Sequence, residues 1–209
     1  MIELNTVIMF TVASLLLALA PGPDNIFVLT QSIANGKSVG MIITLGLCTG
    51  LIVHTTVVAL GISVIFKTSM IAFNILKYLG AAYLLYLSWL AFRAPSNRIQ
   101  ISQNNRMSTI KYYRRGIIMN VTNPKVSIFF MAFLPQFTNP EKGLITLQLI
   151  FLGFIFIVAT FLVFGSISQI AAIIGNWIIK TKNGQNYLNK ISGIVFIALA
   201  VKLFFTARQ

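Results

Sequence analysis

The feature that most constrains this chain is a succession of apolar stretches, each about as long as a bilayer is thick. An α-helix needs about 20 apolar residues to cross the hydrocarbon core, and in lipid every backbone group must be hydrogen-bonded within the protein, which favours helices. The sequence therefore predicts an all-α, polytopic membrane protein with six transmembrane helices, at residues 5–32, 38–66, 70–92, 116–138, 144–174 and 187–206.

Charged residues are too few to form a soluble surface. They make up 9% of the chain, and the acidic ones are Glu3, Asp24 and Glu141, whereas a soluble domain needs a far more charged exterior. The net charge of +13 raises the question of nucleic acid, which basic proteins bind through a charged soluble face. Here the Lys and Arg residues lie mostly between apolar stretches, which is typical of membrane proteins. We expect the lipid bilayer, and no nucleic acid, as a partner.

The basic segment 93–115 sets the predicted orientation. It contains six Lys and Arg residues and no acid, and such loops remain on the cytoplasmic side. With six spans, both termini then lie outside. The segment also divides the chain into a first three-helix repeat (1–92) and a second one (116–209) within one membrane domain. An odd number of spans in each repeat predicts that the two repeats are inverted, as in many transporters.

The first span is interrupted by Pro21, Gly22 and Pro23. Proline lacks an N–H donor and clashes with the preceding helical turn, so we expect a broken helix with a new half-helix that starts near Pro23. Backbone groups freed inside a membrane must face protein or a wet cavity. The first break therefore predicts an interior site.

The fourth span carries a matching break at Asn123 and Pro124. Asparagine is a favoured N-cap and proline a favoured first helical residue. Two free half-helix N-termini, each with partial positive charge, would suit a carboxylate. The sequence thus predicts that the first and fourth helices are both broken and that both breaks offer backbone donors to a small anion.

Asp24 and Lys125 directly follow the two breaks at equivalent places in the repeats. Ionisable side chains within spans are usually functional, and a two-fold axis in the membrane plane would bring these two together. We expect them to face one cavity and to pair with each other in the empty state. An amino acid could then offer its carboxylate to Lys125 and its ammonium to Asp24. The alternative is a static ion pair that locks the breaks together.

Other polar residues are weaker candidates. Asn25 and Asn123 flank the charged pair and are candidate substrate ligands, as is Thr49 in the second span, which could instead bond to its own helix. Asp24 and His54 are candidates for a proton relay, although a lone histidine is more often hydrogen-bonded within the bundle. The Gly46-x-x-x-Gly50 motif predicts close helix contact, either inside the bundle or at a homodimer seam.

Several classes of function lack their residues. The sequence shows no metal cluster, no Gly-rich phosphate loop and no nucleophile–base pair with recognisable spacing, so we expect no metal, no cofactor and no enzyme. A cation or metal exporter would need several converging carboxylates, thiolates or histidines. A passive channel remains an alternative.

These motifs together resemble the lysine and homoserine exporter family (LysE/RhtB) over nearly the whole chain. The resemblance rests on the first break, on the Asn123-Pro124-Lys125 motif and on three further stretches, which start at Gly36, Lys77 and Phe133. It implies six spans in a bacterial inner membrane and efflux of amino acids or close derivatives, driven by the proton-motive force. Because Asp24 is the only acid in the predicted spans, we expect neutral rather than dibasic substrates.

Overall fold

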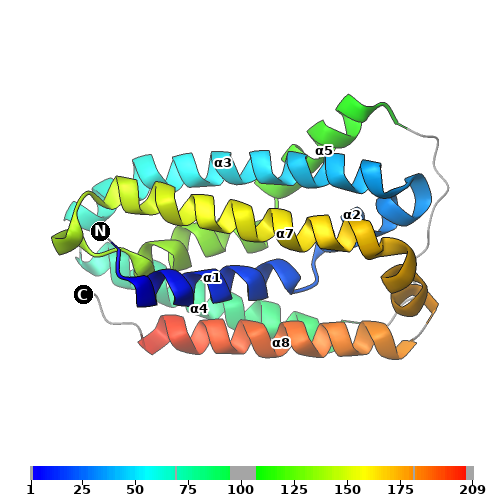
Figure 1. The fold of residues 1–209 in the computed structure, drawn as a ribbon. Helices are drawn as coiled ribbons and strands as arrows, with labels where there is room; N and C mark the ends of the chain where they lie inside the picture. The colour runs from blue at the N-terminus through cyan, green and yellow to red at the C-terminus, as the bar shows by residue number, and fades with distance from the viewer. Residues whose placement is uncertain (1, 69, 95–106, 181, 206–209) are drawn as a thin grey trace.

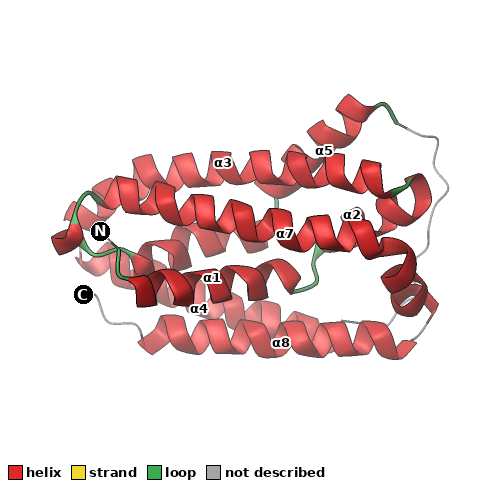
Figure 2. Cartoon of the chain, viewed as in Figure 1, coloured by secondary structure: helices red, strands yellow, loops and turns green. Residues whose placement is uncertain are grey.

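Every regular element in the described part of the chain is helical (Figure 2). The computed structural model describes residues 2–68, 70–94, 107–180 and 182–205, so positions 95–106 of the predicted linker lie outside the described residues. The predicted all-α fold is confirmed for the described part.

The first predicted span is two helices with a break between them. Helix α1 (Leu4–Leu19) ends before Pro21, and α2 (Pro23–Asn35) begins at the second proline of the break. Their axes differ by 59°. The long α3 (Lys37–Thr68) and α4 (Met70–Arg93) follow and match the predicted second and third spans within two residues.

The fourth span is also broken, with a bend of 49°. Helix α5 (Thr109–Val121) ends before Pro124, and the chain continues as α6 (Pro124–Ile128), a π-helical turn η1 (Phe129–Phe133) and a 3-10 turn η2 (Leu134–Phe137). The predicted start of this span at residue 116 is wrong by seven residues. Lys111, Arg114 and Arg115 belong to the same helix, because a helix continues beyond the apolar region wherever its backbone hydrogen bonds persist.

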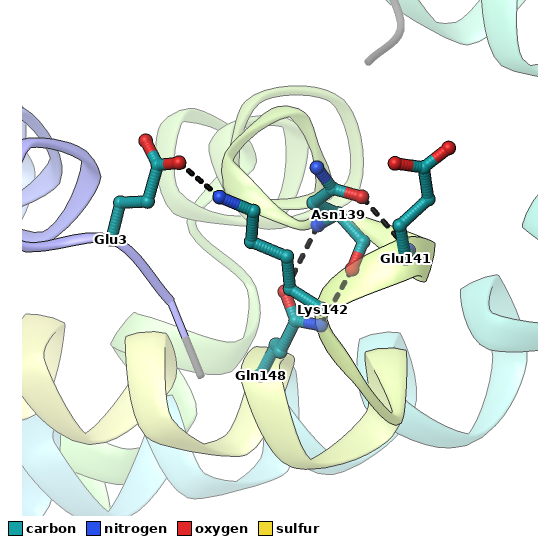
Figure 3. Close-up of polar contacts among 5 residues, drawn as sticks. All are labelled: Glu3, Asn139, Glu141, Lys142 and Gln148. Atoms are coloured by element: carbon teal, nitrogen blue, oxygen red, sulfur yellow. Dashed lines mark hydrogen bonds and ion pairs between the residues drawn. The ribbon is translucent and has the colours of Figure 1, made fainter.

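A tight connection leads into the second half's long helix. The 3-10 turn η3 (Pro140–Lys142) precedes α7 (Ile145–Lys180), and α8 (Lys182–Phe205) completes the described chain. The Gln148 side chain donates to the Asn139 carbonyl (2.8 Å) and accepts from the Asn139 N–H (2.9 Å). These bonds hold the turn that carries Lys142, whose amine contacts the Glu3 carboxylate at the start of α1 (Figure 3).

The helices form one bundle in which the two halves exchange contacts. The broken first span (α1 and α2) packs against α7, and α5 packs against α3; α3 also packs along α7, and α4 along α8. Each half thus lays its first span on the long helix of the other half. The division into repeats at 93–115 itself stays a prediction.

The bundle has the dimensions of a membrane domain. Among the described residues, three single helices (in α3, α4 and α7) and the two bent pairs are long and apolar enough to cross a bilayer, and α8 runs beside α4 over the length of the bundle (Figure 1). Helix α1 begins and α8 ends at one end, whereas α4 ends and α5 begins at the other.

Glycines allow the close packing of α3 against α5. A Cβ on Gly46 would lie 2.2 Å from the Tyr113 carbonyl oxygen, and one on Gly50 would lie 2.7 Å from Asn120 Cβ. The Gly46-x-x-x-Gly50 motif therefore serves packing inside the bundle. A homodimer stays an untested prediction.

Candidate functional site

The first break frees backbone carbonyls, and two side chains satisfy them. Leu17 would normally accept from residue 21, but Pro21 has no N–H. Instead, Lys125 Nζ donates to the carbonyls of Leu17 (3.3 Å) and Ala20 (2.9 Å), and Asn25 Nδ2 donates to Ala18 (2.7 Å). A cation at the C-terminal end of α1 also complements the helix dipole. Lys125 and Asn25 therefore complete the end of α1.

Gly22 makes room for the lysine. A Cβ at this position would lie 3.1 Å from Lys125 Nζ and 3.5 Å from its Cε. The backbone of Gly22 is extended (φ −164°, ψ −179°), a conformation open to any residue, so the close approach of Lys125 is what favours glycine here. The two breaks meet at this contact.

The expected ion pair between Asp24 and Lys125 is not formed between these two described residues, so this prediction is wrong. The Lys125 amine is directed to carbonyls of α1 rather than to the carboxylate. Asp24 is only 2% exposed, and its Oδ1 has no hydrogen-bond partner among the described residues. The side chains of Asn123 and Asn120 lie near this carboxylate. The structure thus brings Asp24 and Lys125 into one site but leaves the carboxylate without its predicted partner.

The second break caps itself. The Asn123 side chain accepts from Lys125 N (3.0 Å), and the Asn123 carbonyl accepts from Val126 N (3.1 Å) and Ser127 N (3.0 Å). The expectation of a free N-terminus here is therefore wrong, because these donors are already used. Helix α2 has no side-chain cap, and its first helical bond runs from Ile26 N to the Gly22 carbonyl. The N–H groups of Asp24 and Asn25 precede that bond and make no backbone hydrogen bond among the described residues, so of the two breaks the first is the one with helical donors to offer.

A small cavity lies where the breaks meet α7. Its volume of about 10 Å³ is on the scale of a single water molecule. An amino acid does not fit into a space of this size, so the cavity would have to widen to admit one, as in lid- and gate-controlled sites. Four elements line the cavity: α1 (Leu17, Ala18), α2 (Asp24), α6 (Lys125, Val126) and α7 (Phe156, Thr160, Phe164).

Most of the unpaired polar atoms in the described part belong to the two breaks or to the cavity wall. Buried polar groups are nearly always hydrogen-bonded, yet six buried side-chain atoms in the described part have no partner. Five of the six belong to the two breaks or to the cavity wall: Asp24 Oδ1, Asn25 Oδ1, Asn120 Oδ1, Asn123 Nδ2 and Thr160 Oγ1. Sequence reasoning missed Asn120 and Thr160 as site residues. The signal for Thr160 was a single hydroxyl in a long apolar stretch.

The two remaining candidates lie apart from the cavity lining. His54 Nε2 is 3.1 Å from the Asn120 carbonyl, which is the hydrogen-bonded role within the bundle; its part in proton transfer stays a prediction. Thr49 Oγ1 donates to the Leu45 carbonyl (3.0 Å) and pairs with Tyr113 Oη (2.8 Å), and it does not line the cavity. The structure therefore does not place Thr49 with the other candidates.

Comparisons with known proteins identify the family. The chain matches the family model "LysE type translocator" over residues 15–206. It is 34% identical over 194 residues to the homoserine/homoserine lactone efflux protein of Salmonella typhi, covering 93% of each chain. It is also 34% identical over 196 residues to the membrane protein YrhP of Bacillus subtilis, covering 90% of this chain and 92% of that one. No solved structure matches.

The family and the names of these relatives point to a multi-pass membrane transporter of small molecules rather than to an enzyme. The broken first and fourth spans, with their charged residues on one cavity, lie within the matched range. The chain belongs to the LysE type translocator family.

Proposed function

We propose that this protein is a secondary active exporter of neutral amino acids or close derivatives, driven by the proton-motive force. The observation that carries the proposal is the buried Asp24 carboxylate, which lines a small cavity between two broken spans and whose Oδ1 has no partner among the described residues. A carboxylate buried within a membrane span lowers stability, and such residues are usually kept because they serve a function. A translocator with such a group has an acceptor for a cationic part of its substrate.

The Salmonella typhi relative is named for efflux of homoserine and homoserine lactone. These two molecules share an α-ammonium group, whereas only the free amino acid has a carboxylate. The group that a common site can recognise is therefore the ammonium. In our proposal Asp24 accepts from that ammonium. The substrate carboxylate, where present, accepts hydrogen bonds from the N–H groups at the start of α2 and from Asn123 Nδ2, which has no partner among the described residues.

In this proposal Lys125 has a structural role, whereas its charge alone predicts that it binds the substrate carboxylate. Its amine bridges the carbonyls of Leu17 and Ala20, so it holds the two breaks together and adds positive charge beside the cavity. Asp24 can take up a proton when the substrate ammonium leaves, which would couple release to the proton gradient. His54, hydrogen-bonded to Asn120, is the second candidate for that proton.

The basic segment supplies the proposed orientation in a bacterial inner membrane. Segment 93–115 lies in the cytoplasm by the positive-inside rule, and both termini lie outside. The end of the bundle where α4 ends and α5 begins (Figure 1) is then the cytoplasmic end, from which substrate enters.

A growth screen followed by a transport assay tests the proposal. A sensitive bacterial host that expresses the protein is grown on toxic levels of individual amino acids and analogues, with Asp24→Asn and Lys125→Ala as controls. Everted vesicles are then assayed for uptake of labelled L-homoserine and L-threonine, with and without a protonophore. We expect uptake that the protonophore abolishes. Uptake that survives the protonophore would indicate a passive channel, and resistance to metal salts alone would indicate a cation exporter.

A further inference from the structure

Thr160 differs from the other buried hydroxyl residues of the helices. Hydroxyl groups within helices commonly bond to the carbonyl four residues earlier, as Ser14 (2.7 Å), Thr44 (2.9 Å) and Thr55 (2.8 Å) do here. Thr160 is only 3% exposed, yet its Oγ1 has no hydrogen-bond partner in the described part of the chain, its own helix included. Its hydroxyl is therefore not used to satisfy α7.

The place of Thr160 gives that hydroxyl a use. Phe156, Thr160 and Phe164 are four residues apart, so they share one face of α7, and this face lines the cavity that Asp24 also lines. Asp24 and Thr160 thus line one small space, and neither Asp24 Oδ1 nor Thr160 Oγ1 has a hydrogen-bond partner among the described residues. The phenyl rings of Phe156 and Phe164 line the cavity on either side of Thr160.

We propose that Thr160 is a substrate-binding and specificity residue that accepts a hydrogen bond from the ammonium group held by Asp24. This inference rests on the proposed function and deepens it by naming the chemistry of the site. A primary ammonium carries three N–H donors, and it can donate to the carboxylate and to the hydroxyl at once. The site therefore selects substrates with a free primary ammonium and rejects N-acylated ones, which lack the charge and two of the donors.

The stability of the substrate-free protein provides a second test of the proposed role of Thr160. A buried hydroxyl without a partner lowers stability, so its removal can be neutral or stabilising. Thr160→Val should keep or raise the thermal stability of the substrate-free protein while it weakens transport. A residue that serves only packing would change stability and transport together.

The test uses the full chain in everted vesicles with L-homoserine as the probe. Thr160→Val is compared with Thr160→Ser, which restores a hydroxyl, and with Thr44→Val, which removes a buried hydroxyl that is bonded to its own helix. A hydrogen bond to a charged group is worth about tenfold or more in affinity. We expect Thr160→Val to raise the KM about tenfold or more, with Thr160→Ser near the wild type and Thr44→Val unchanged.

Competition by N-acetyl-L-homoserine adds a second measurement, the preference for a free ammonium, which a residue that serves only packing would not change. The wild type should prefer homoserine strongly over the acetylated compound, and Thr160→Val should lose part of that preference. Three results would overturn the inference: a wild-type KM in Thr160→Val, a KM in Thr160→Ser as high as that in Thr160→Val, or an unchanged preference for homoserine. Transport by the wild type would still uphold the proposed function in each case. Wild-type vesicles that take up neither homoserine nor threonine would overturn both.

Discussion

The two helix breaks look alike in sequence and differ in how they are completed. Gly22-Pro23-Asp24 and Asn123-Pro124-Lys125 each place a proline at the first position of a new helix, followed by a charged residue. The bends are 59° and 49°. The second break is closed by its own Asn123 cap, whereas the first has no side-chain cap and takes Lys125 from the other half.

This difference indicates separate roles for Lys125 and Asp24, although their opposite charges alone suggest one ion pair. Lys125 satisfies backbone groups of the first break, so its position is tied to the architecture of the bundle. Asp24 lines the cavity, and its Oδ1 has no hydrogen-bond partner among the described residues. In our proposal, equivalent positions in the two halves have different roles: the lysine is mainly structural and the aspartate binds the solute.

The largest effect on stability is expected from Lys125→Met. The variant keeps the apolar stem but leaves the carbonyls of Leu17 and Ala20 without their donor. Because each unsatisfied buried group costs roughly 1–3 kcal/mol, we expect the free energy of unfolding in mixed detergent micelles to fall by about 3 kcal/mol. Lys37→Met, at an exposed position on α3, is the matched control and should change little. Equal stability of the two variants would show that the first break does not depend on Lys125.

A smaller loss is expected from Gly22→Ala. The new Cβ would press on Lys125 Nζ at 3.1 Å, and overpacking of this kind costs about 1 kcal/mol or somewhat more. Gly61→Ala on α3 is the control, because nothing lies within 4 Å of its Cβ position and alanine favours a helix over glycine. The two variants should shift the melting temperature in opposite directions. A neutral Gly22→Ala would show that Lys125 does not need this close passage.

The smallest effect is expected at the exposed contact between the halves, where Glu3 meets Lys142 (Figure 3). The hydrogen bond and charge of Lys142 hold the pKa of Glu3 below its usual value of 4.5. A depressed pKa contributes stability above the unfolded pKa, and this contribution disappears as the pH falls through the folded pKa. Glu3→Gln should therefore lower the melting temperature slightly at pH 7 and low salt, and not at all once Glu3 of the wild type is protonated.

High salt should also remove the difference between Glu3→Gln and the wild type at pH 7, since exposed pairs are screened. If Glu3→Gln lowered stability as much as Lys125→Met, the exposed contact between Glu3 and Lys142, and not the paired breaks, would be what joins the two halves.

Much of the helix arrangement could be predicted from the sequence, because about 20 apolar residues must span a bilayer and prolines interrupt helices. The start of α5 could not, since hydropathy detects the membrane rather than the helix, and the basic turn Lys111–Arg115 is helical outside the apolar region.

The site was only partly predictable. The equivalence of Asp24 and Lys125 placed both charges at one cavity, but attraction between opposite charges was the wrong guide to hydrogen bonding. Pro21 deprives the Leu17 carbonyl of its donor, and that unmet need explains where the lysine is bound. Thr160 escaped notice because one hydroxyl barely alters the hydropathy of α7 (Ile145–Lys180). Its missing hydrogen bond is visible only in three dimensions.

The central claim is that Asp24 holds substrate and Lys125 holds the fold. The most direct test measures Asp24→Asn for stability and for L-homoserine transport in the same preparation. Since a buried carboxylate with an unpaired oxygen is costly, we predict a free energy of unfolding equal to or above that of the wild type. We also predict a KM raised about tenfold, because a neutral amide replaces a charge-assisted hydrogen bond. An Asp24→Asn protein that unfolds as readily as Lys125→Met, or that transports like the wild type, would contradict the account.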